Sequence, residues 1–556
     1  MQFKRLIVVG TASSPKEILL TQIPTTPRPD TLPVQVSQYV PLPVMQNTHS
    51  QVSQHNTSLR LRIPHLLFFL FIVIQSTIIL MQKNGPFFDE AIYVTAGFRA
   101  LQGKGLDDGY LIWFAGSLLW PLMAALSYLV HGLLAVRFLA LGLAFLTLLT
   151  SYLTTKNLFG EKASCFTLLA FIASGPFMAL SHLGVYDSPA LAFTSISLWS
   201  ITQLKHNHRI WLCISAVSFA FAVIAKYPIG LMLIPLLALL IHYRKEKSLG
   251  DVCLFLFIFT AVFLAFFLSC QYQVGDWFSW SSQNKPTFGS TRTVIIFAQI
   301  YFGLIPFVIA VVGFLLSKRK NMTIILLLTG LIWPLYHIIS GNPVSDNKHV
   351  VFGFLFTYPL IGLFFARLWE KKIFYKAVAL LTIISLLLIG SLQLYRLDLA
   401  WPDVRQPAAF LVQNTHYGDK LLINDSWSYN MYLYANHKIA TPWDVFDGYR
   451  ITNNESKIDL CSYNWFVNEE GSYAWPESVL AKIKTCKNFV AVFHYSSQVI
   501  GLGSNFQFVT YTVKTTIWKN TKMRGDTSQN TDPSFPYVNN QLLSKKEKCL
   551  RCEITK

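Results

Sequence analysis

Residues 65–81 read HLLFFLFIVIQSTIILM, a run of apolar side chains interrupted only by Gln75, Ser76 and Thr77. This length is close to the roughly 20 residues that a helix needs to cross the hydrocarbon core of a bilayer. Further apolar blocks of similar length follow at 132–155, 162–182, 188–204, 210–225, 227–243, 250–271, 293–316, 321–340, 349–368 and 374–394. The sequence therefore predicts a multi-span α-helical membrane protein with about eleven transmembrane helices.

The composition agrees with a membrane protein. Hydrophobic residues make up 53% of the 556 residues and charged residues only 13%, about half the charged share of a soluble domain. The formal net charge is +18, but the basic residues lie in short loops between the apolar blocks and form no continuous basic face. That distribution is typical of cytoplasmic loops and argues against nucleic-acid binding.

The basic loops also predict the topology. Arg60 and Arg62 precede the first block, and five further basic clusters are each separated from the next by two apolar blocks: Lys156/Lys162, Lys205/Arg209, Arg244/Lys245/Lys247, Lys318/Arg319/Lys320 and Lys371/Lys372. All six groups lie in the cytoplasm only if the additional apolar block 111–130 does not cross the membrane. We therefore predict that this block is a helix on the outer surface, that the N-terminus lies inside and that the C-terminus lies outside.

The composition divides the chain into four parts. Residues 1–60, rich in Pro, Thr, Ser and Gln, are predicted to be a disordered cytoplasmic segment. Residues 64–395 form the transmembrane domain, with a long first outer loop at 83–131. Residues 396–522 are predicted to be a small extracytoplasmic α/β domain, and 523–556 a flexible tail. The elements expected in the α/β domain are a helix at 407–414 and strands at 420–424, 488–493 and 506–517.

Four cysteines follow the last block. Cys461 and Cys486 are expected to form a disulfide if their domain faces an oxidising compartment. Cys549 and Cys552 have the spacing of half a zinc site or of a redox motif, but no second pair of ligands accompanies them.

The predicted outer segments contain conspicuous acidic residues. Asp89 and Glu90 follow the first block directly in GPFFDEAIY, and Asp187 is the sole acid of the short segment GVYDSPA. A carboxylate at the membrane surface is partly desolvated, which makes it a stronger base. The same positions also suit the capping of a following helix. Both interpretations remain open at this point.

Basic residues in the same segments are candidates for binding an anion. Lys226 lies in AKYP, a short turn between two apolar blocks, where an ammonium group is unfavourable unless it meets an anion. It either reaches lipid headgroups or binds a lipid-linked phosphate. Lys348 and His349 offer a second phosphate contact and Arg292 a weaker third. Arg137 is expected to pair with an acid of the first outer loop.

The order of several short motifs resembles a known superfamily. The motifs are Phe88-Asp89-Glu90-Ala91-x-Tyr93, Gly132-x-x-x-x-Arg137-Phe-Leu, Asn157-Leu-Phe-Gly160, Asp187 after the third block and Lys226-Tyr-Pro. This layout, over about residues 64–395, resembles the C-type superfamily of membrane glycosyltransferases. It is most similar to the branch of dolichyl-phosphate-mannose protein mannosyltransferases and bacterial lipid A aminoarabinose transferases (glycosyltransferase family 39-like). That branch often has a His-Pro-Pro-Leu-like turn in the first loop, where this chain has only Trp120-Pro121-Leu122, so the acceptor stays open.

The resemblance implies a C-type glycosyltransferase fold and an inverting transfer. A sugar moves from a polyprenyl-phosphate donor to an acceptor hydroxyl of a lipid, polysaccharide or protein at the outer face. Asp89 is implied to be the general base, and Glu90 and Asp187 to position the donor or the acceptor. The implied phosphate-binding residues are Lys226, Lys348, His349 and Arg292. The substrate-loop candidates are Tyr93, Arg137 and Tyr186. Some relatives bind a divalent metal near the acids, but no ligand cluster in this sequence requires a metal or other cofactor.

Two other functions are weighed against this one. A lipid-linked-sugar flippase or transporter is expected to show internal repeats and polar groups at mid-membrane, and the sequence shows neither. A non-catalytic scaffold leaves Asp89, Asp187 and Lys226 without a shared purpose. The modest size and the absence of a retention signal favour a bacterial cytoplasmic (inner) membrane.

Overall fold

The first helix begins earlier than the sequence predicts. The computed structural model describes residues 51–82, 84–104, 114–204, 208–244, 248–283, 291–341, 346–446, 459–471, 475–502 and 508–523. Helix α1 spans Gln51–Met81, so the prediction of disorder was wrong for residues 51–60, while residues 1–50 lie outside the described part. No proline stands between Pro43 and Pro64, and nothing in that interval stops the helix from extending beyond its apolar run. From Ser58 on, the chain forms one compact unit.

The multi-span helical class is confirmed. Within the described ranges, eight helices are long and apolar enough to cross a membrane: Ile63–Met81, Leu119–Phe159, Tyr227–Arg244, Leu249–Ser279, Thr293–Leu316, Lys320–Ser340, Asn347–Trp369 and Ile373–Asp398. They coincide with eight of the eleven predicted blocks. The other three blocks form shorter helices, namely α4 (Glu161–Ile172) with α5 (Gly175–Leu180), α6 (Asp187–Thr202) and α7 (His208–Ala225).

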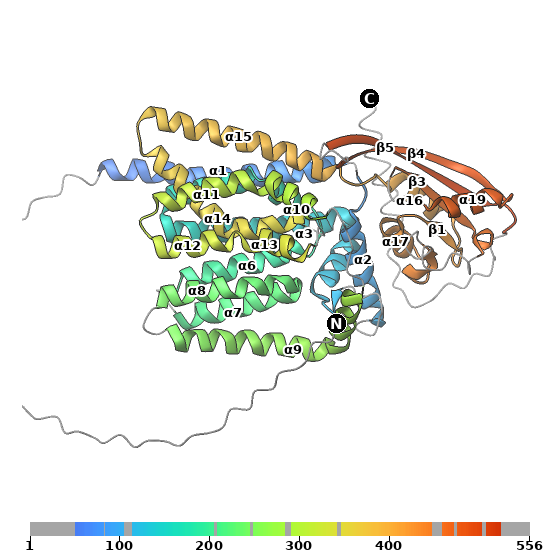
Figure 1. Ribbon diagram of the computed structural model, residues 1–556, viewed down its shortest axis with the longest axis horizontal. Coiled ribbons are helices and arrows are strands. Elements are labelled where there is room, and N and C mark those ends of the chain that lie inside the picture. Colours follow the sequence, from blue (N-terminus) through green and yellow to red (C-terminus); the bar gives the residue numbers. More distant parts are fainter. Residues whose placement is uncertain are drawn as a thin grey trace, which may run out of the picture. The chain divides into compact units, whose positions relative to one another are not determined.

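The remaining helices of this part follow in chain order. They are η3 (Tyr227–Met232), α8 (Leu233–Arg244), α9 (Ser248–Gln283), α10 (Thr291–Gln299), η5 (Ile300–Leu304), α11 (Ile305–Leu316), α12 (Lys320–Thr329), α13 (Ile332–Ser340), α14 (Asp346–Trp369) and α15 (Ile373–Asp398). Figure 1 shows α6, α7, α8 and α9 running roughly parallel to α11 to α14, with α9 at the edge of the bundle.

The predicted surface helix corresponds to the first part of α3 (Leu119–Phe159). A kink at His131 and Gly132, where the φ of Gly132 is +60°, separates this part from the apolar part that follows. It packs against α2 (Phe88–Arg99), which continues into η1 (Ala100–Lys104). The packing is close, because a Cβ atom added to Gly97 of α2 would lie 2.0 Å from the carbonyl oxygen of Pro121. The part of α3 before Gly132 is therefore a separate helical segment that packs on α2; its place on the outer surface stays a prediction.

Helix α14 is the central helix of the bundle. Of the residues in its most apolar 18-residue stretch, 94% are buried inside the protein. The corresponding share is 6% for α9 and 22% for α15. Small residues let its neighbours approach closely: a Cβ atom on Gly313 of α11 would lie 2.1 Å from the oxygen of Leu360, and one on Gly362 would lie 2.3 Å from that of Ala163. Such contacts are typical of helix association in lipid. They fix α14, which carries Lys348 and His349 at its beginning.

Three of the predicted cytoplasmic loops meet at one end of the helices. The Lys156 ammonium lies 2.7 Å from the Glu161 carboxylate, and Lys162 lies 3.5 Å from Glu370. Arg319 donates from Nη1 to the Leu158 carbonyl at 2.9 Å. These contacts confirm that the loops near residues 156–162, 318–320 and 370–372 share one side of the bundle.

A five-stranded sheet follows α15, as predicted for a C-terminal α/β region. The strand order is β2 (Val445–Phe446), β1 (Leu421–Ile423), β3 (Trp465–Glu470), β5 (Phe508–Asn520) and β4 (Phe489–Leu502). β1 is parallel to β2 and β3, while β5 is antiparallel to β3 and β4. Figure 1 shows β4 and β5 as two long neighbouring strands. The predicted helix and strands are present. The sequence missed β2, β3, two α-helices and two short 3-10 helices. The helices of this region are α16 (Arg405–Asn414), α17 (Ser426–Ala435), α19 (Glu477–Thr485), η6 (Pro442–Asp444) and η8 (Leu460–Ser462).

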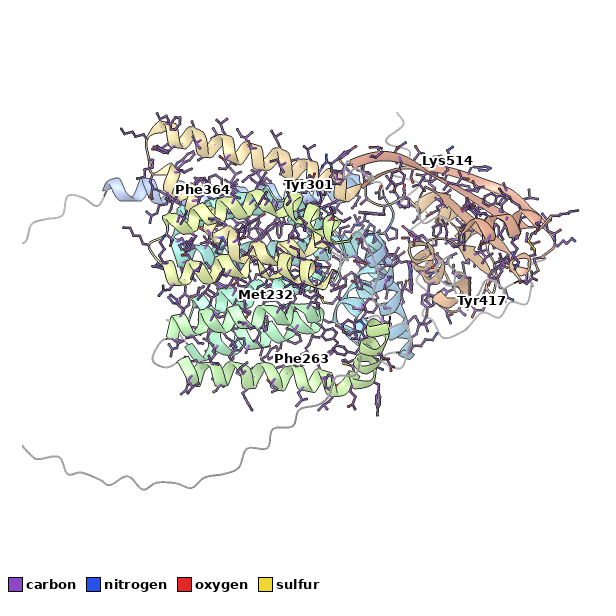
Figure 2. The ribbon with its side chains drawn as sticks, in the orientation of Figure 1. Met232, Phe263, Tyr301, Phe364, Tyr417 and Lys514 are labelled. Carbon is purple, nitrogen blue, oxygen red and sulfur yellow. A yellow bond between two sulfur atoms is a disulfide. The ribbon has the colours of Figure 1, made fainter. Side chains whose placement is uncertain are left out.

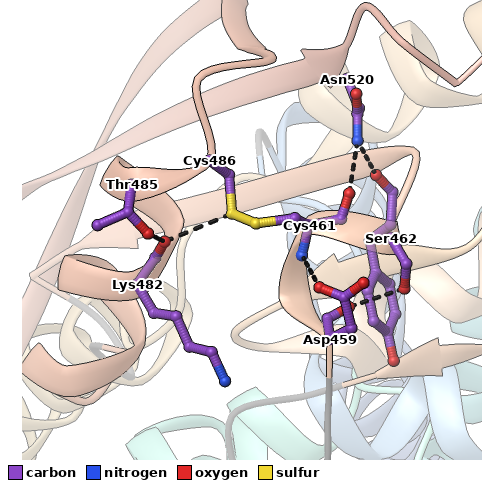
Figure 3. Close-up of a disulfide and its surroundings, with 8 residues drawn as sticks. Asp459, Cys461, Ser462, Lys482, Thr485, Cys486 and Asn520 are labelled. Carbon is purple, nitrogen blue, oxygen red and sulfur yellow. Dashed lines mark hydrogen bonds between the residues drawn. A yellow bond between two sulfur atoms is a disulfide. The ribbon is translucent and has the colours of Figure 1, made fainter.

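The predicted disulfide is confirmed. Cys461 and Cys486 are bonded, with Cα atoms 5.6 Å apart (Figure 3). The bridge joins η8 to the end of α19, and Asn520 of β5 holds η8 through a 2.9 Å hydrogen bond to the Cys461 carbonyl. The other two cysteines of interest, Cys549 and Cys552, lie outside the described residues.

The sheet region is attached to the segment that follows α1 and to the end of α15. Asn84 donates to the carbonyls of Asp398 and Trp401 at 2.7 and 3.1 Å. The β4–β5 hairpin contacts Tyr301, labelled in Figure 2, whose ring centroid lies 5.1 Å from that of Phe508. The sheet is therefore held at the end of the bundle where the first loop lies.

A buried acid inside the sheet gives a first prediction. Glu469 is fully buried and accepts a 2.6 Å hydrogen bond from Tyr429, and burial together with Asp425 raises the pKa of Glu469 to about 8. A folded-state pKa above the unfolded value means that the protonated acid contributes stability at low pH, which is lost as the pH rises through about 8. We expect the melting temperature to fall less between pH 6 and 9 in Glu469→Gln than in the native protein. The exposed neighbour provides the control, since Glu470→Gln should retain the native pH dependence.

Candidate active site

Glu90 is an internal anchor of the first loop. It is fully buried, and its Oε1 accepts from Arg137 Nε at 3.1 Å and from the Gly184 amide at 2.8 Å. Its Oε2 accepts from Arg137 Nη2 and the Phe87 amide, at 2.9 and 2.8 Å. The predicted pairing of Arg137 with an acid of this loop is thereby confirmed. Four donors occupy the carboxylate, which ties the start of α2 to α3 and to the segment before α6.

Asp89 points away from Glu90, because adjacent residues of a helix are about 100° apart. Its Oδ2 lies 2.5 Å from the Nζ of Lys348 on α14, and 22% of the Asp89 side chain is exposed. The Lys348 ammonium also lies 5.1 Å from the centre of the Phe87 ring. The structure thus brings together two candidates that are 259 residues apart in the sequence.

Asp187 and Lys226 form a second, deeper ion pair. The Lys226 ammonium donates to Asp187 Oδ1, and both side chains are buried, with exposed fractions of 0% and 1%. Lys226 lies 4.4 Å from the ring centre of Tyr186 and 5.7 Å from that of Phe352. The second oxygen of Asp187 is buried and has no hydrogen-bond partner among the described residues.

Electrostatics join the two pairs into one cluster. Burial lowers the pKa of Lys226 to about 8; Asp187 acts in the opposite direction, and Lys348 lowers it further. Asp89 also interacts with Lys226, and Asp187 with Lys348. Two carboxylates and two ammonium groups therefore lie within electrostatic reach of one another, in a setting with little water.

A histidine pair adjoins the cluster. His349 Nδ1 lies 2.8 Å from Nε2 of His337, which belongs to α13. His337 was not among the sequence candidates. A single histidine inside the apolar block 321–340 was the available signal, because polar groups in a membrane helix need partners. Its pairing with His349 could not be seen without the structure.

The other sequence candidates have simpler surroundings. Tyr93 is buried, and its ring packs edge-on against that of Tyr186, with centroids 4.9 Å apart. The two tyrosines therefore connect α2 to the segment that leads into α6. Arg292 lies in α10, but its side chain is outside the described part of the structure. Among the described side chains, no three His, Cys, Asp or Glu residues are grouped so that they could hold a metal ion.

His182 supports the segment before α6 through two side-chain contacts. His182 Nδ1 lies 3.0 Å from Gln75 Oε1, and its Nε2 lies 2.8 Å from Asp398 Oδ1. The residue is fully buried and joins α1 and α15 to the segment that carries Tyr186 and Asp187. The position of Asp187 is thus determined by contacts from α1, α15 and α2, and from Lys226, which lies between α7 and η3.

Comparisons with known proteins were made once this geometry was established. Residues 116–270 match the family model described as dolichyl-phosphate-mannose-protein mannosyltransferase. No curated protein sequence matches the chain. Among solved structures, ArnT from Cupriavidus metallidurans in the apo state matches with 13% identity and a TM-score of 0.53, over 84% of this chain and 98% of that one.

A second solved structure is the Archaeoglobus fulgidus oligosaccharyltransferase in complex with Zn and sulfate. It matches with 13% identity and a TM-score of 0.48, over 79% of this chain and 72% of that one. The likeness to ArnT, which extends over nearly the whole of that protein, shows a common fold.

Proposed function

We propose that this chain is a C-type membrane glycosyltransferase that takes its sugar from a lipid-linked donor, and that the cluster around Asp89 and Lys226 is its active site. The family-model match over residues 116–270 and the fold shared with ArnT support the proposal. The observation that carries the proposal is the gathering of two acids, two lysines and a histidine pair at one end of an apolar bundle. The specific donor is a polyprenyl-phosphate sugar, and the acceptor is a hydroxyl group at the outer face of the membrane.

The depth of the two ion pairs suggests how the substrates are divided between them. Asp187 and Lys226 are fully buried, whereas the Asp89 side chain is 22% exposed. A donor phosphate held at the membrane surface by its lipid chain approaches the buried pair, and an acceptor arrives from water at the exposed acid. We therefore assign the phosphate to Lys226 and Lys348, and the role of general base to Asp89.

The reaction then involves one bond made and one broken at the sugar. Asp89 removes the proton from the acceptor hydroxyl, whose oxygen attacks the anomeric carbon on the face opposite the phosphate. The bond between that carbon and the phosphate oxygen breaks, and polyprenyl phosphate leaves with the electron pair and one additional negative charge. Lys226 and Lys348 stabilise this developing charge, which is the kind of electrostatic contribution that accelerates group transfer most. Inversion at the anomeric carbon follows from attack on the opposite face.

The ion pairs seen without substrate give donor binding a second effect. The Lys348 ammonium lies 2.5 Å from Asp89 Oδ2 when no substrate is bound. A donor phosphate that binds Lys348 competes with Asp89 for this ammonium group. Donor binding therefore frees the Asp89 carboxylate to accept a hydrogen bond from the acceptor hydroxyl.

Glu90 has a positioning role in this scheme. Its two oxygens already accept four hydrogen bonds from protein groups, so it has little capacity to contact substrate. By fixing the start of α2, it fixes the direction of Asp89. The unpartnered oxygen of Asp187 is the better candidate for a direct contact with the sugar of the donor.

The function is tested with purified full-length protein in liposomes that contain radiolabelled polyprenyl-phosphate sugars. If the protein transfers sugar, addition of an acceptor should move the label from the lipid to the acceptor. Polyprenyl phosphate should be released in an equal amount. A panel of donors with different sugars identifies the preferred one. Label that crosses the bilayer with its bond to phosphate intact would instead support a flippase, and would refute the proposed reaction.

The lowered pKa of Lys226 predicts an alkaline limit to donor binding. Only the ammonium form attracts phosphate, and burial lowers the pKa of Lys226 to about 8, so kcat/KM for the donor should fall above about pH 8. Lys226→Arg should move this limb upward by at least one pH unit, because a guanidinium stays charged throughout this range. The measurement is kcat/KM between pH 6 and 10. An identical alkaline limb in the two proteins would contradict the assignment.

A further inference from the structure

Three buried polar atoms near the proposed phosphate site have no hydrogen-bond partner among the residues that the structure describes. They are Asp187 Oδ2, His349 Nε2 and Trp333 Nε1. Buried polar atoms are nearly always hydrogen-bonded in native proteins, and exceptions need an explanation. Trp333 and His349 are in contact, with ring centroids 4.6 Å apart. Unpaired groups next to one another indicate a place that a polar ligand completes.

His349 faces Lys226. Residues three apart lie on one face of a helix, so His349 shares a face of α14 with Phe352, whose ring centroid is 6.2 Å away. The Lys226 ammonium lies 5.7 Å from the same Phe352 ring. His349 is buried, with 6% of its surface exposed, and both Lys226 and Lys348 interact with it electrostatically.

The surroundings of His349 favour the neutral imidazole. A third positive charge, buried beside two ammonium groups, is unfavourable both by desolvation and by repulsion. A neutral imidazole carries one N–H and one acceptor nitrogen. The bond between His337 Nε2 and His349 Nδ1, at 2.8 Å, contains a single hydrogen. Two arrangements are therefore open: either His337 donates and His349 keeps its hydrogen on Nε2, or the reverse.

An anionic ligand distinguishes the two arrangements. If His337 donates, the Nε2–H of His349 is free to donate to a phosphate oxygen. If His349 donates to His337, its Nε2 presents a lone pair to the same oxygen and repels it. Only the first arrangement is complementary to a phosphate, and it adds a neutral hydrogen-bond donor to the two ammonium groups.

We propose that His337 is a positioning residue, which donates from Nε2 to His349 Nδ1 and thereby keeps a hydrogen on His349 Nε2 for the phosphate of the donor. This inference rests on the proposed function, since it requires that a phosphate occupies the site. His337 is well suited to this role, because it is 1% exposed and packs against Trp333 and Tyr336, with ring centroids 6.2 and 5.3 Å away.

Two substitutions separate hydrogen bonding from packing. His337→Phe keeps a ring against Trp333 but has no N–H, whereas His337→Gln loses the ring but keeps an amide N–H close to the position of Nε2. If the role is hydrogen bonding, His337→Phe should raise the donor KM about tenfold with a smaller change in kcat, and His337→Gln should stay within about threefold of the native protein. If the role is packing, the order of the two variants is reversed, which overturns the proposal.

A double variant tests whether His337 acts through His349. In His349→Ala the hydrogen bond is already absent, so adding His337→Phe should have little further effect on donor KM. Independent, additive effects of the two substitutions would refute a role exerted through His349. Direct binding of radiolabelled polyprenyl phosphate is measured alongside transfer. A native protein that binds no polyprenyl phosphate would overturn the site itself, whereas binding that is equal in His337→Phe and the native protein would overturn only the role of His337.

Discussion

Asp89→Asn is expected to lower kcat for sugar transfer by about 10²–10⁴-fold, the usual contribution of a general base. Asparagine has nearly the same shape as aspartate but cannot accept the proton of the acceptor hydroxyl. The fold should survive, because asparagine has the shape of aspartate and its amide oxygen can still accept a hydrogen bond from Lys348. The Asp89 side chain is also 22% exposed, so water reaches this position. The measurement is initial transfer rate against donor and acceptor concentration.

The effect of Asp89→Asn on the donor KM can also be predicted. Loss of the negative charge at position 89 frees Lys348, whose ammonium lies 2.5 Å from Asp89 Oδ2 in the native protein. Lys348 is then fully available to the phosphate, so the donor KM should stay the same or fall while kcat collapses. A rise in donor KM with an unchanged kcat would contradict the role of base and would make Asp89 a donor-binding residue.

A matched control exists at the other end of the bundle. Asp251 pairs with Arg244, and the exposed fractions of the two side chains are 14% and 18%, similar to those of Asp89 and Lys348. Asp251→Asn removes an ion pair of the same kind, far from the proposed site. It should leave kcat within about twofold of the native protein, as is usual for a surface substitution. An equal loss of activity in both variants would point to a general effect on the bundle.

The sequence predicted which residues belong to the site but not how they pair. Lys226 and Asp187 are conspicuous because charges are rare in apolar segments, and alternation of basic loops placed them at the same end as Asp89. Their direct contact spans 39 residues, and the contact of Asp89 with Lys348 spans 259. Such pairings depend on how the helices pack around α14, and no local pattern encodes that packing.

The adjacent acids Asp89 and Glu90 illustrate a further limit of prediction from the sequence. Asp89 and Glu90 are equivalent candidates in the sequence, yet one faces the site and the other lies inside the protein with four donors. The rotation of α2 about its own axis decides which acid faces the site. The close packing of Gly97 on Pro121 and the ion pair of Glu90 with Arg137 fix that rotation. In the same way, His337 gains significance only because α13 places it against His349.

The fold was predictable to the extent that it follows from hydropathy. The apolar blocks, the separate arm before Gly132 and the strands near residues 421 and 489 follow from composition and alternation. β3 and α17 were missed, because WFVNEE (465–470) ends in acids and SWSYNMYLYA (426–435) alternates little. Both elements are stabilised by contacts from elsewhere, including the Trp427 ring, whose centroid lies 5.7 Å from that of Phe88.

Arg137→Met is expected to destabilise the protein by about 3–5 kcal/mol, the usual consequence of removing one partner of a buried ion pair. The Glu90 carboxylate has an exposed fraction of 0% and would lose two of its four hydrogen bonds, at 3.1 and 2.9 Å. The Gly85 carbonyl would lose its 2.9 Å bond from Nη2 as well. Methionine fills a similar volume, so the loss reflects charge and hydrogen bonding more than packing. The free energy of unfolding is measured in detergent micelles by loss of helical circular dichroism.

Two further variants show whether the buried charge is responsible. Glu90→Gln combined with Arg137→Met leaves no charge at the site, so the double variant should be more stable than Arg137→Met alone. Lys156→Met breaks the exposed pair with Glu161, whose side chains are 43% and 33% exposed, and should change stability by at most about 1 kcal/mol. If Arg137→Met is no more harmful than Lys156→Met, the Glu90 network does not hold the first loop. The direction of Asp89 would then have to be fixed by other contacts, such as those of Trp427 with Phe88 and of Tyr93 with Tyr186.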